Sequence, residues 1–246
     1  MDLAEKIGTT VYRHPWEISR ASCVLDLARD LLAAGPLADI GSGDLYFADR
    51  LQDCAFADVV AVDSAYAVQK PPKMHGITAY SDISLLNRDL YGSVFLLDVL
   101  EHIEDDVEFL ARVSELLMKK GSLFITVPAH PVLFSVHDAF LGHKRRYTRK
   151  AFIKILKSSG FVPEKIFYFY FSLAVVRFLE VLAVRFGLKS LSKQAVSRWR
   201  YPASSFVTAL LVSLLNMDFK ICLMLSRIGL HLPGLTLCAI CKKTSL

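Results

Sequence analysis

The chain has 246 residues, of which 53% are hydrophobic and 22% charged, and its formal net charge is +5. So apolar a chain can bury enough surface to offset the entropy of ordering, which excludes an intrinsically disordered protein. Its length fits one α/β domain with an additional segment.

Charge is distributed unevenly along the chain. Residues 1–142 hold 11 Lys and Arg against 21 Asp and Glu, whereas residues 143–203 hold 14 against 2. Each basic residue near a lipid headgroup layer contributes about 1 kcal/mol of attraction. Because these basic residues alternate with Phe, Leu and Val in long apolar segments, we expect an anionic membrane surface as the partner and no nucleic acid.

The cysteines and the first residues suggest a compartment. The five cysteines are odd in number and scattered, and Cys238 and Cys241 form a CxxC without a second ligand pair, so we expect reduced thiols and no metal. Residues 1–13 contain charges and no apolar run of signal-peptide length. We therefore expect a cytoplasmic protein.

Predicted helices and strands alternate along the chain. Apolar residues recur at helical spacing over 17–32, and further helices are expected to begin near Tyr46, after Asp105 and after Thr148. Short apolar runs predict strands at 37–40, 59–62, 77–80, 93–97, 122–127, 161–169 and 235–241. This rhythm is typical of βαβ units and a parallel sheet.

A long apolar segment separates the last two predicted strands. We divide the chain into a core at 1–166, an apolar and basic helical insertion at 167–233, and a final strand at 234–246 that returns to the core. Charged residues interrupt both apolar stretches of the insertion before about 20 residues, the length of a membrane span. Helices lying in a membrane interface fit better, and a homodimer interface is the alternative.

The most informative motif follows the first predicted strand. Gly41, Ser42 and Gly43 form a turn between that strand and a helix, where backbone N–H groups can approach an anionic ligand. About twenty residues later, Asp63 and Ser64 follow the next strand, where a carboxylate can accept hydrogen bonds from ribose hydroxyls. Together these signals indicate an adenosine-type cofactor.

These motifs resemble those of the class I S-adenosylmethionine-dependent methyltransferases over about residues 10–170 and the last strand. The resemblance implies a Rossmann-like, doubly wound fold with a seven-stranded mixed sheet. It also implies that Asp39, with the two glycines, cradles the methionine end of S-adenosylmethionine. Asp63 would hold the ribose, and Asp82 with Ile83 would face the adenine.

A second matching segment lies at the end of the fourth predicted strand. Residues 95–103 resemble the strand-four signature of the family, which places Asp98 and Val99 against the cofactor. Glu101 is interpreted as a carboxylate at a helix start and His102 as a structural histidine. One departure is that the third glycine usual in the family falls at Leu45.

Residues 128–147 follow the fifth predicted strand and lie at the ligand edge of such a sheet. His137, His143, Asp138 and Tyr147 offer general acid–base groups, and either histidine is a candidate for the base that deprotonates the methyl acceptor. The same side chains match no compact metal-ligand spacing, so we expect no metal.

These observations predict a methyltransferase that is peripheral on the inner face of a membrane and acts on a small lipid-like or lipid-linked acceptor. Two alternatives remain. One is a methyltransferase acting on a soluble small molecule, with the insertion as a dimer interface. The other is a non-catalytic lipid- or protein-binding module that keeps the fold.

Overall fold

The computed structural model describes residues 13–29, 32, 35–54, 58–71, 76–187 and 205–244. Within them a mixed sheet has the strand order β3-β2-β1-β4-β5-β7-β6. The strands are β1 (Leu37–Ile40), β2 (Val59–Val62), β3 (Ile77–Tyr80), β4 (Tyr91–Leu97), β5 (Leu117–Pro128), β6 (Phe161–Phe169) and β7 (Thr236–Lys243). The first five run parallel, and β7 runs antiparallel to both β5 and β6.

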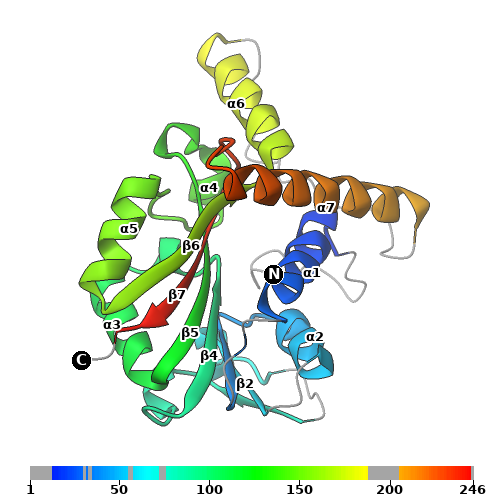
Figure 1. Ribbon diagram of the computed structural model, residues 1–246. Coiled ribbons are helices and arrows are strands. Elements are labelled where there is room, and N and C mark those ends of the chain that lie inside the picture. The colour runs from blue at the N-terminus through cyan, green and yellow to red at the C-terminus, as the bar shows by residue number, and fades with distance from the viewer. Residues whose placement is uncertain are drawn as a thin grey trace.

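Helices cover both faces of the sheet, with α1 and α2 on one side and α3 and α5 on the other (Figure 1). The helices are α1 (Pro15–Ala28), α2 (Tyr46–Cys54), α3 (Asp106–Leu116), α4 (Val136–Phe140), α5 (Arg149–Ser158), α6 (Phe171–Arg185) and α7 (Phe206–Arg227). Because the central β4 is buried on both faces, all seven of its residues are buried, as expected for a parallel strand between two helical layers. The predicted doubly wound, seven-stranded fold is therefore confirmed.

Most predicted elements agree with the structure, and the differences lie at element ends. Asp105 caps α3 by accepting from the backbone N–H of Glu108 at 2.9 Å, and Thr148 caps α5 through Ala151 at 3.2 Å. The third helix ends earlier than its apolar pattern suggests, because β5 already begins at Leu117. The strand continues past Lys120, whose φ of 62° is left-handed.

The segment before the last strand leaves the sheet at its carboxyl edge. Since β6 runs parallel to β5, the end of β6 at Phe169 and the end of β5 at Pro128 both lie opposite Thr236 of β7. The two helices α6 and α7 project from this end of the sheet (Figure 1). The strand predicted at 161–169 is confirmed as β6, and its residues Phe167 and Phe169 are buried against α7.

Helix α7 lies across α1 and is anchored by one of its faces. Leu215, Phe219 and Cys222 are buried in a cluster with Phe169 and Tyr170, and the amide oxygen of Asn216 accepts from the hydroxyl of Ser19 at 2.6 Å. By length and composition alone this 22-residue helix, which contains an 18-residue window with a mean hydropathy of 1.7, could cross a membrane. One face of the helix packs against α1 and β6.

Candidate active site

The loop after β1 is fixed by contacts to the neighbouring strands. The backbone N–H groups of Gly41 and Ser42 donate to the carbonyl of Val62 at 2.7 and 3.0 Å. Gly41 has a left-handed φ of 78°, and a Cβ there would overlap Cγ2 of Val99. The two predicted cofactor-binding segments, after β1 and after β4, are therefore in direct contact.

Asp63 joins this loop to the end of β2. One carboxylate oxygen accepts from the backbone N–H of Gly43 at 2.8 Å and the other from that of Ala65 at 2.9 Å. Tyr66 adds a bond from its hydroxyl to the carbonyl of Gly43 at 2.8 Å, and Ser64 is exposed beside it. Each carboxylate oxygen retains acceptor capacity, so the predicted contact with ribose hydroxyls fits this geometry.

Asp39 provides a test of whether the site suits S-adenosylmethionine. Its side chain is buried, and its Oδ2 atom has no hydrogen-bond partner among the described residues. Burial raises the pKa of this carboxyl from 3.8 to about 7. Because a buried carboxylate needs a partner, the ammonium group of the methionine end is a suitable one.

Leu45 explains how the chain departs from the glycine pattern. Its φ is 68°, so the backbone keeps the left-handed conformation that glycine adopts without strain. The side chain is only 1% exposed and packs with Phe47 and Leu51 in the core. Burying a leucine contributes about 1.5–3 kcal/mol, enough to offset left-handed strain of about 1–2 kcal/mol.

The predicted adenine contacts lie at the end of β3, two strands from β1. Asp82 is 60% exposed and accepts from the backbone N–H of Ser84 at 2.7 Å, a bond that lowers its pKa. Ile83 beside it is buried. Asp82 is therefore accessible at the surface, where it also faces the guanidinium of Arg112 at 3.7 Å.

Asp98 is the centre of a polar contact that the sequence did not reveal. It accepts from the hydroxyl of Thr126 at 3.0 Å and forms an ion pair with Arg20 of α1. The Arg20 guanidinium also lies 4.4 Å from the centre of the Trp16 ring. The sequence did contain one sign of this contact. Arg20 lies four residues after Trp16 and three before Cys23, so a charged side chain lies on the apolar face of α1.

In the loop after β5, Asp138 organises the predicted catalytic residues. It is fully buried and accepts from Ser135, from Arg146 at 2.8 Å and from Nδ1 of His143 at 3.1 Å. Although burial alone would raise it, the pKa of Asp138 lies well below its usual range because of His143 and Arg146. His137 lies on the same helix, and burial lowers the pKa of its ring.

Tyr147 is placed differently from the other predicted catalytic residues. Its buried hydroxyl donates to Oδ2 of Asp106 at 3.1 Å and approaches the carbonyl of Leu100 at 3.2 Å. Burial raises the pKa of this phenol above its ordinary value. These contacts tie the loop to α3, and a catalytic role for Tyr147 stays a prediction.

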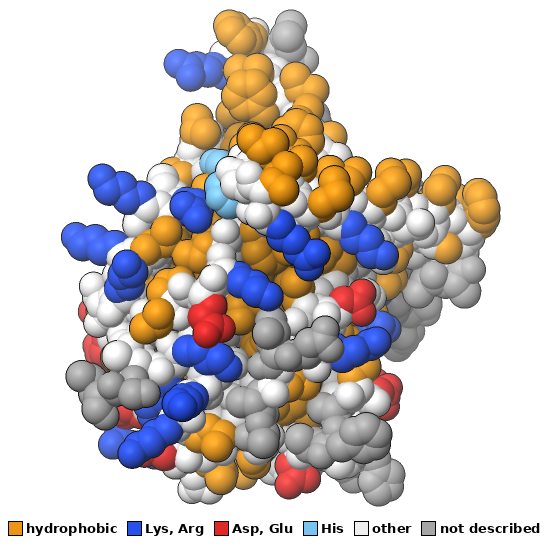
Figure 2. All heavy atoms as spheres, viewed as in Figure 1, with side chains coloured by type: hydrophobic (Ala, Val, Ile, Leu, Met, Phe, Trp, Pro, Cys, Tyr) orange, Lys and Arg blue, Asp and Glu red, His pale blue; other side chains and the backbone are white. Residues whose placement is uncertain are grey.

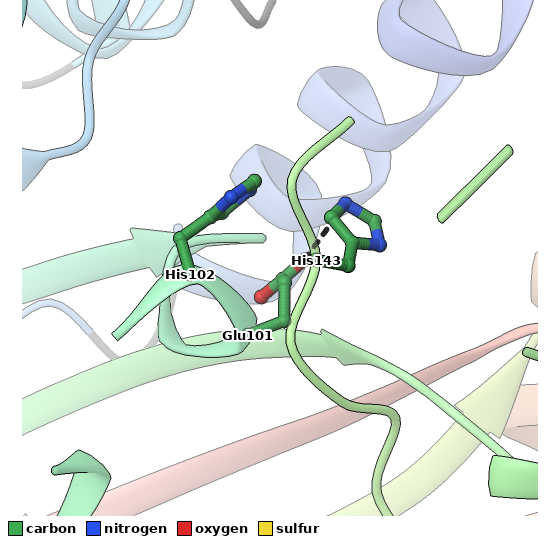
Figure 3. Close-up of side chains that lie close together, drawn as sticks. All are labelled: Glu101, His102 and His143. Carbon is green, nitrogen blue, oxygen red and sulfur yellow. Dashed lines mark ion pairs between the residues drawn. The ribbon is translucent and has the colours of Figure 1, made fainter. Parts of the chain in front are cut away.

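Glu101 and His102 lie closer to the predicted catalytic loop than their structural interpretation suggested. They belong to a short 3-10 helix after β4, η4 (Leu100–His102), and His143 approaches them from the loop after α4 (Figure 3). The His102 and His143 rings meet edge to face with centres 4.9 Å apart. Sequence spacing cannot reveal this group, because about forty residues separate its members.

Residues 19–166 match the family model described as a methyltransferase domain. The match covers more than half of the chain, so the protein belongs to this family, the class I S-adenosylmethionine-dependent methyltransferases. Its cofactor is S-adenosylmethionine. A search of the curated proteins found no match.

Solved structures share the fold at low sequence identity. Phosphoethanolamine N-methyltransferase 2 from Haemonchus contortus has a TM-score of 0.56 at 16% identity, over 92% of this chain and 52% of that one. This chain thus spans about half of the Haemonchus protein. An S-adenosylmethionine-dependent methyltransferase from Mesorhizobium loti gives 0.53 at 14%, over 93% and 97% of the two chains. A Burkholderia thailandensis 1,6-didemethyltoxoflavin-N1-methyltransferase gives 0.50 at 14%, over 97% and 94%.

Proposed function

We propose that the protein transfers the methyl group of S-adenosylmethionine to a small lipid-like or lipid-linked acceptor at an anionic membrane surface. The observation that carries this proposal is a stripe of exposed hydrophobic side chains on α7. Its members recur at helical spacing and are between 42% and 81% exposed: Phe206, Leu210, Leu214, Met217, Ile221 and Met224. Water-exposed apolar stripes of this kind are typical of interaction surfaces.

The exposed apolar surface continues from the helices to the predicted catalytic loop. Arg177 of α6 donates to the hydroxyl of Ser135 at 3.3 Å, which fixes α6 beside this loop. Three apolar side chains of the loop are themselves exposed: Val132 at 69%, Phe134 at 39% and Phe140 at 51%. An acceptor dissolved in a membrane could therefore approach the carboxyl edge of the sheet from the apolar side.

Charge favours an anionic membrane over a second copy of the chain. Figure 2 shows Lys and Arg side chains beside and below the two apolar helices. Residues 143–203 hold 14 basic residues against 2 acidic ones. Two copies meeting through this region would bring like charges together, whereas anionic lipid headgroups complement them.

When bound, the cofactor supplies a methyl group on a positively charged sulfur. The chain's own part is to hold and orient the two reactants, which supplies much of the acceleration in such displacements. Asp39 and Asp63 would hold the two ends of the cofactor, and the loop after β5 would position the acceptor. The proposal holds whichever histidine of that loop takes the acceptor's proton.

Vesicle flotation tests the membrane part of the proposal. The triple variant Leu214→Ser/Met217→Ser/Ile221→Ser removes the middle of the stripe, so we expect at least about tenfold weaker binding to vesicles containing phosphatidylglycerol. The matched control is Val68→Ser/Leu85→Ser/Leu90→Ser, which changes three exposed apolar residues elsewhere. Equal flotation of both variants, or dissociation of a dimer by the first variant alone, would overturn the proposed surface.

Methyl transfer is tested separately with S-adenosylmethionine that carries a tritiated methyl group. We expect label to enter the organic phase of a total membrane extract, and to do so more slowly with the triple variant. Label recovered only in water-soluble products would refute a lipid-type acceptor while leaving the methyltransferase itself in place.

A further inference from the structure

A polar cluster beside the predicted cofactor site combines one buried carboxylate with two half-buried histidines. Glu101, His102 and His143 each offer one oxygen or nitrogen atom, and these atoms all lie within 4.8 Å of one another. Glu101 is fully buried, whereas the His143 side chain remains 12% exposed. In Figure 3 the two η4 side chains and His143 approach one another from different segments of the chain.

His143 is held in one orientation. Its Nδ1 atom lies 3.1 Å from a carboxylate oxygen of Asp138, and that carboxylate is kept ionised by Arg146 at 2.7 Å. An ionised carboxylate can only accept, so Nδ1 is the ring nitrogen that donates to Asp138, and Nε2 is the nitrogen that faces Glu101. Metal-binding histidines commonly donate their other ring N–H to a carboxylate, as His143 donates to Asp138 here.

The Nε2 atom of His143 faces a second carboxylate. It lies 3.8 Å from Oε1 of Glu101, which is too far for a hydrogen bond. Neither carboxylate oxygen of Glu101 has a hydrogen-bond partner among the described residues, although both are buried. Such a carboxyl group is costly without a positive partner. Two donor atoms facing each other at this spacing suit a cation that both could bind at about 2.0–2.2 Å.

We propose that Glu101, His102 and His143 bind one divalent transition-metal ion. A carboxylate with two imidazoles is a donor set that suits zinc, manganese or iron, and Mg²⁺ much less because it prefers oxygen ligands. Three protein ligands leave open positions on the ion, as in catalytic sites. This inference departs from the sequence-based expectation of no metal, because the residues meet only in the folded chain.

The ion would lie beside the segment after β4 that carries Asp98 and Val99, and next to the predicted catalytic loop. Its open positions would take an oxygen of the methyl acceptor and lower the pKa of a bound hydroxyl, which aids methyl transfer to that oxygen. This role rests on the proposed function. Binding of the ion does not, and it can be measured without cofactor or acceptor.

Titration of the chelator-treated full chain with Mn²⁺, followed by the electron paramagnetic resonance signal of the free ion, tests the site. We expect one saturable Mn²⁺ per chain, competition by Zn²⁺ and little by Mg²⁺. Glu101→Gln and His102→Ala should weaken Mn²⁺ binding by at least about tenfold. The control is His231→Ala, an exposed histidine outside the cluster, which should bind as the unchanged chain does.

Glu101→Gln keeps the shape of the side chain and removes a buried charge, so it should remain folded by circular dichroism. Absence of saturable Mn²⁺ and Zn²⁺ binding to the folded chain would overturn the proposal. Equal Mn²⁺ binding by Glu101→Gln would do the same and would leave Glu101 as a protonated structural residue. If the unchanged chain binds Mn²⁺ but transfers no methyl group to any lipid-type acceptor, this result would count against the proposed function and leave the metal site in place.

Discussion

Gly41 and Val99 provide the sharpest test of the described site, because one contact joins the loops after β1 and β4. In Gly41→Ala the alanine must keep the left-handed φ of 78°, and its Cβ would overlap Cγ2 of Val99. Left-handed strain in an L-residue costs about 1–2 kcal/mol, and overpacking adds about 1–3 kcal/mol. We therefore expect Gly41→Ala to lower the free energy of unfolding by about 2–5 kcal/mol.

Val99→Ala separates the two contributions. It removes the overlapping methyl group, so Gly41→Ala should cost about 1–3 kcal/mol less in the Val99→Ala background, leaving only the left-handed strain. Urea unfolding of the four proteins, with equal denaturant slopes, measures this coupling. A control is Gly229→Ala, where φ is 82° and a Cβ would meet no described atom within 4 Å. It should show the strain alone.

Additive effects of Gly41→Ala and Val99→Ala would refute the reasoning, since the clash would then involve some other group. An equal loss in Gly229→Ala and Gly41→Ala would show that strain accounts for everything. Either result would show that Gly41 and Val99 do not form the close contact that joins the loops after β1 and β4.

Three further predictions concern single side chains. The folded chain keeps the Asp39 proton to higher pH than the unfolded chain, so the free energy of unfolding should fall by up to about 4 kcal/mol as pH rises from about 4 to about 7. Asp39→Asn should flatten this pH dependence in urea titrations at several pH values. Asp138→Ala leaves Arg146 buried without its ion-pair partner and should lower the unfolding free energy by about 3–5 kcal/mol. The control Asp89→Ala, at an exposed ion pair with Lys243, should leave the unfolding free energy nearly unchanged. Tyr147→Phe removes the hydroxyl bonded to Asp106, so it should lower the free energy of unfolding in urea by about 1–3 kcal/mol and leave methyl transfer per folded molecule unchanged. Lost methyl transfer at unchanged stability would instead support the predicted catalytic role of Tyr147.

The strands and the cofactor turn could be predicted because their signals are local. A fully buried parallel strand needs a continuous apolar run, and the glycine turn after β1 needs residues that tolerate left-handed φ. Both requirements act within about ten residues of sequence. The ends of elements were harder to predict, as at Leu117, because a helix and a buried strand both accept the same apolar residues.

Contacts between distant segments could not be predicted in the same way. The pair Arg20–Asp98 joins residues 78 positions apart, and the group around Glu101 and His143 depends on the path of a loop without regular periodicity. Apolar spacing tells which face of a helix is buried but not which segment covers it. The charged Arg20 on the apolar face of α1 was the one local sign of such a contact.

Asp218 shows how one polar residue can be misjudged from hydropathy alone. In the sequence it interrupts an apolar run and argues against a membrane span. In the structure its carboxylate accepts from the backbone N–H groups of Phe171 and Ser172 at 3.0 and 2.7 Å. These are first-turn donors of α6 that have no partner within their own helix, so Asp218 acts as a cap supplied by another helix. The charge therefore fixes α6 against α7, while the stripe of apolar side chains on α7 remains exposed.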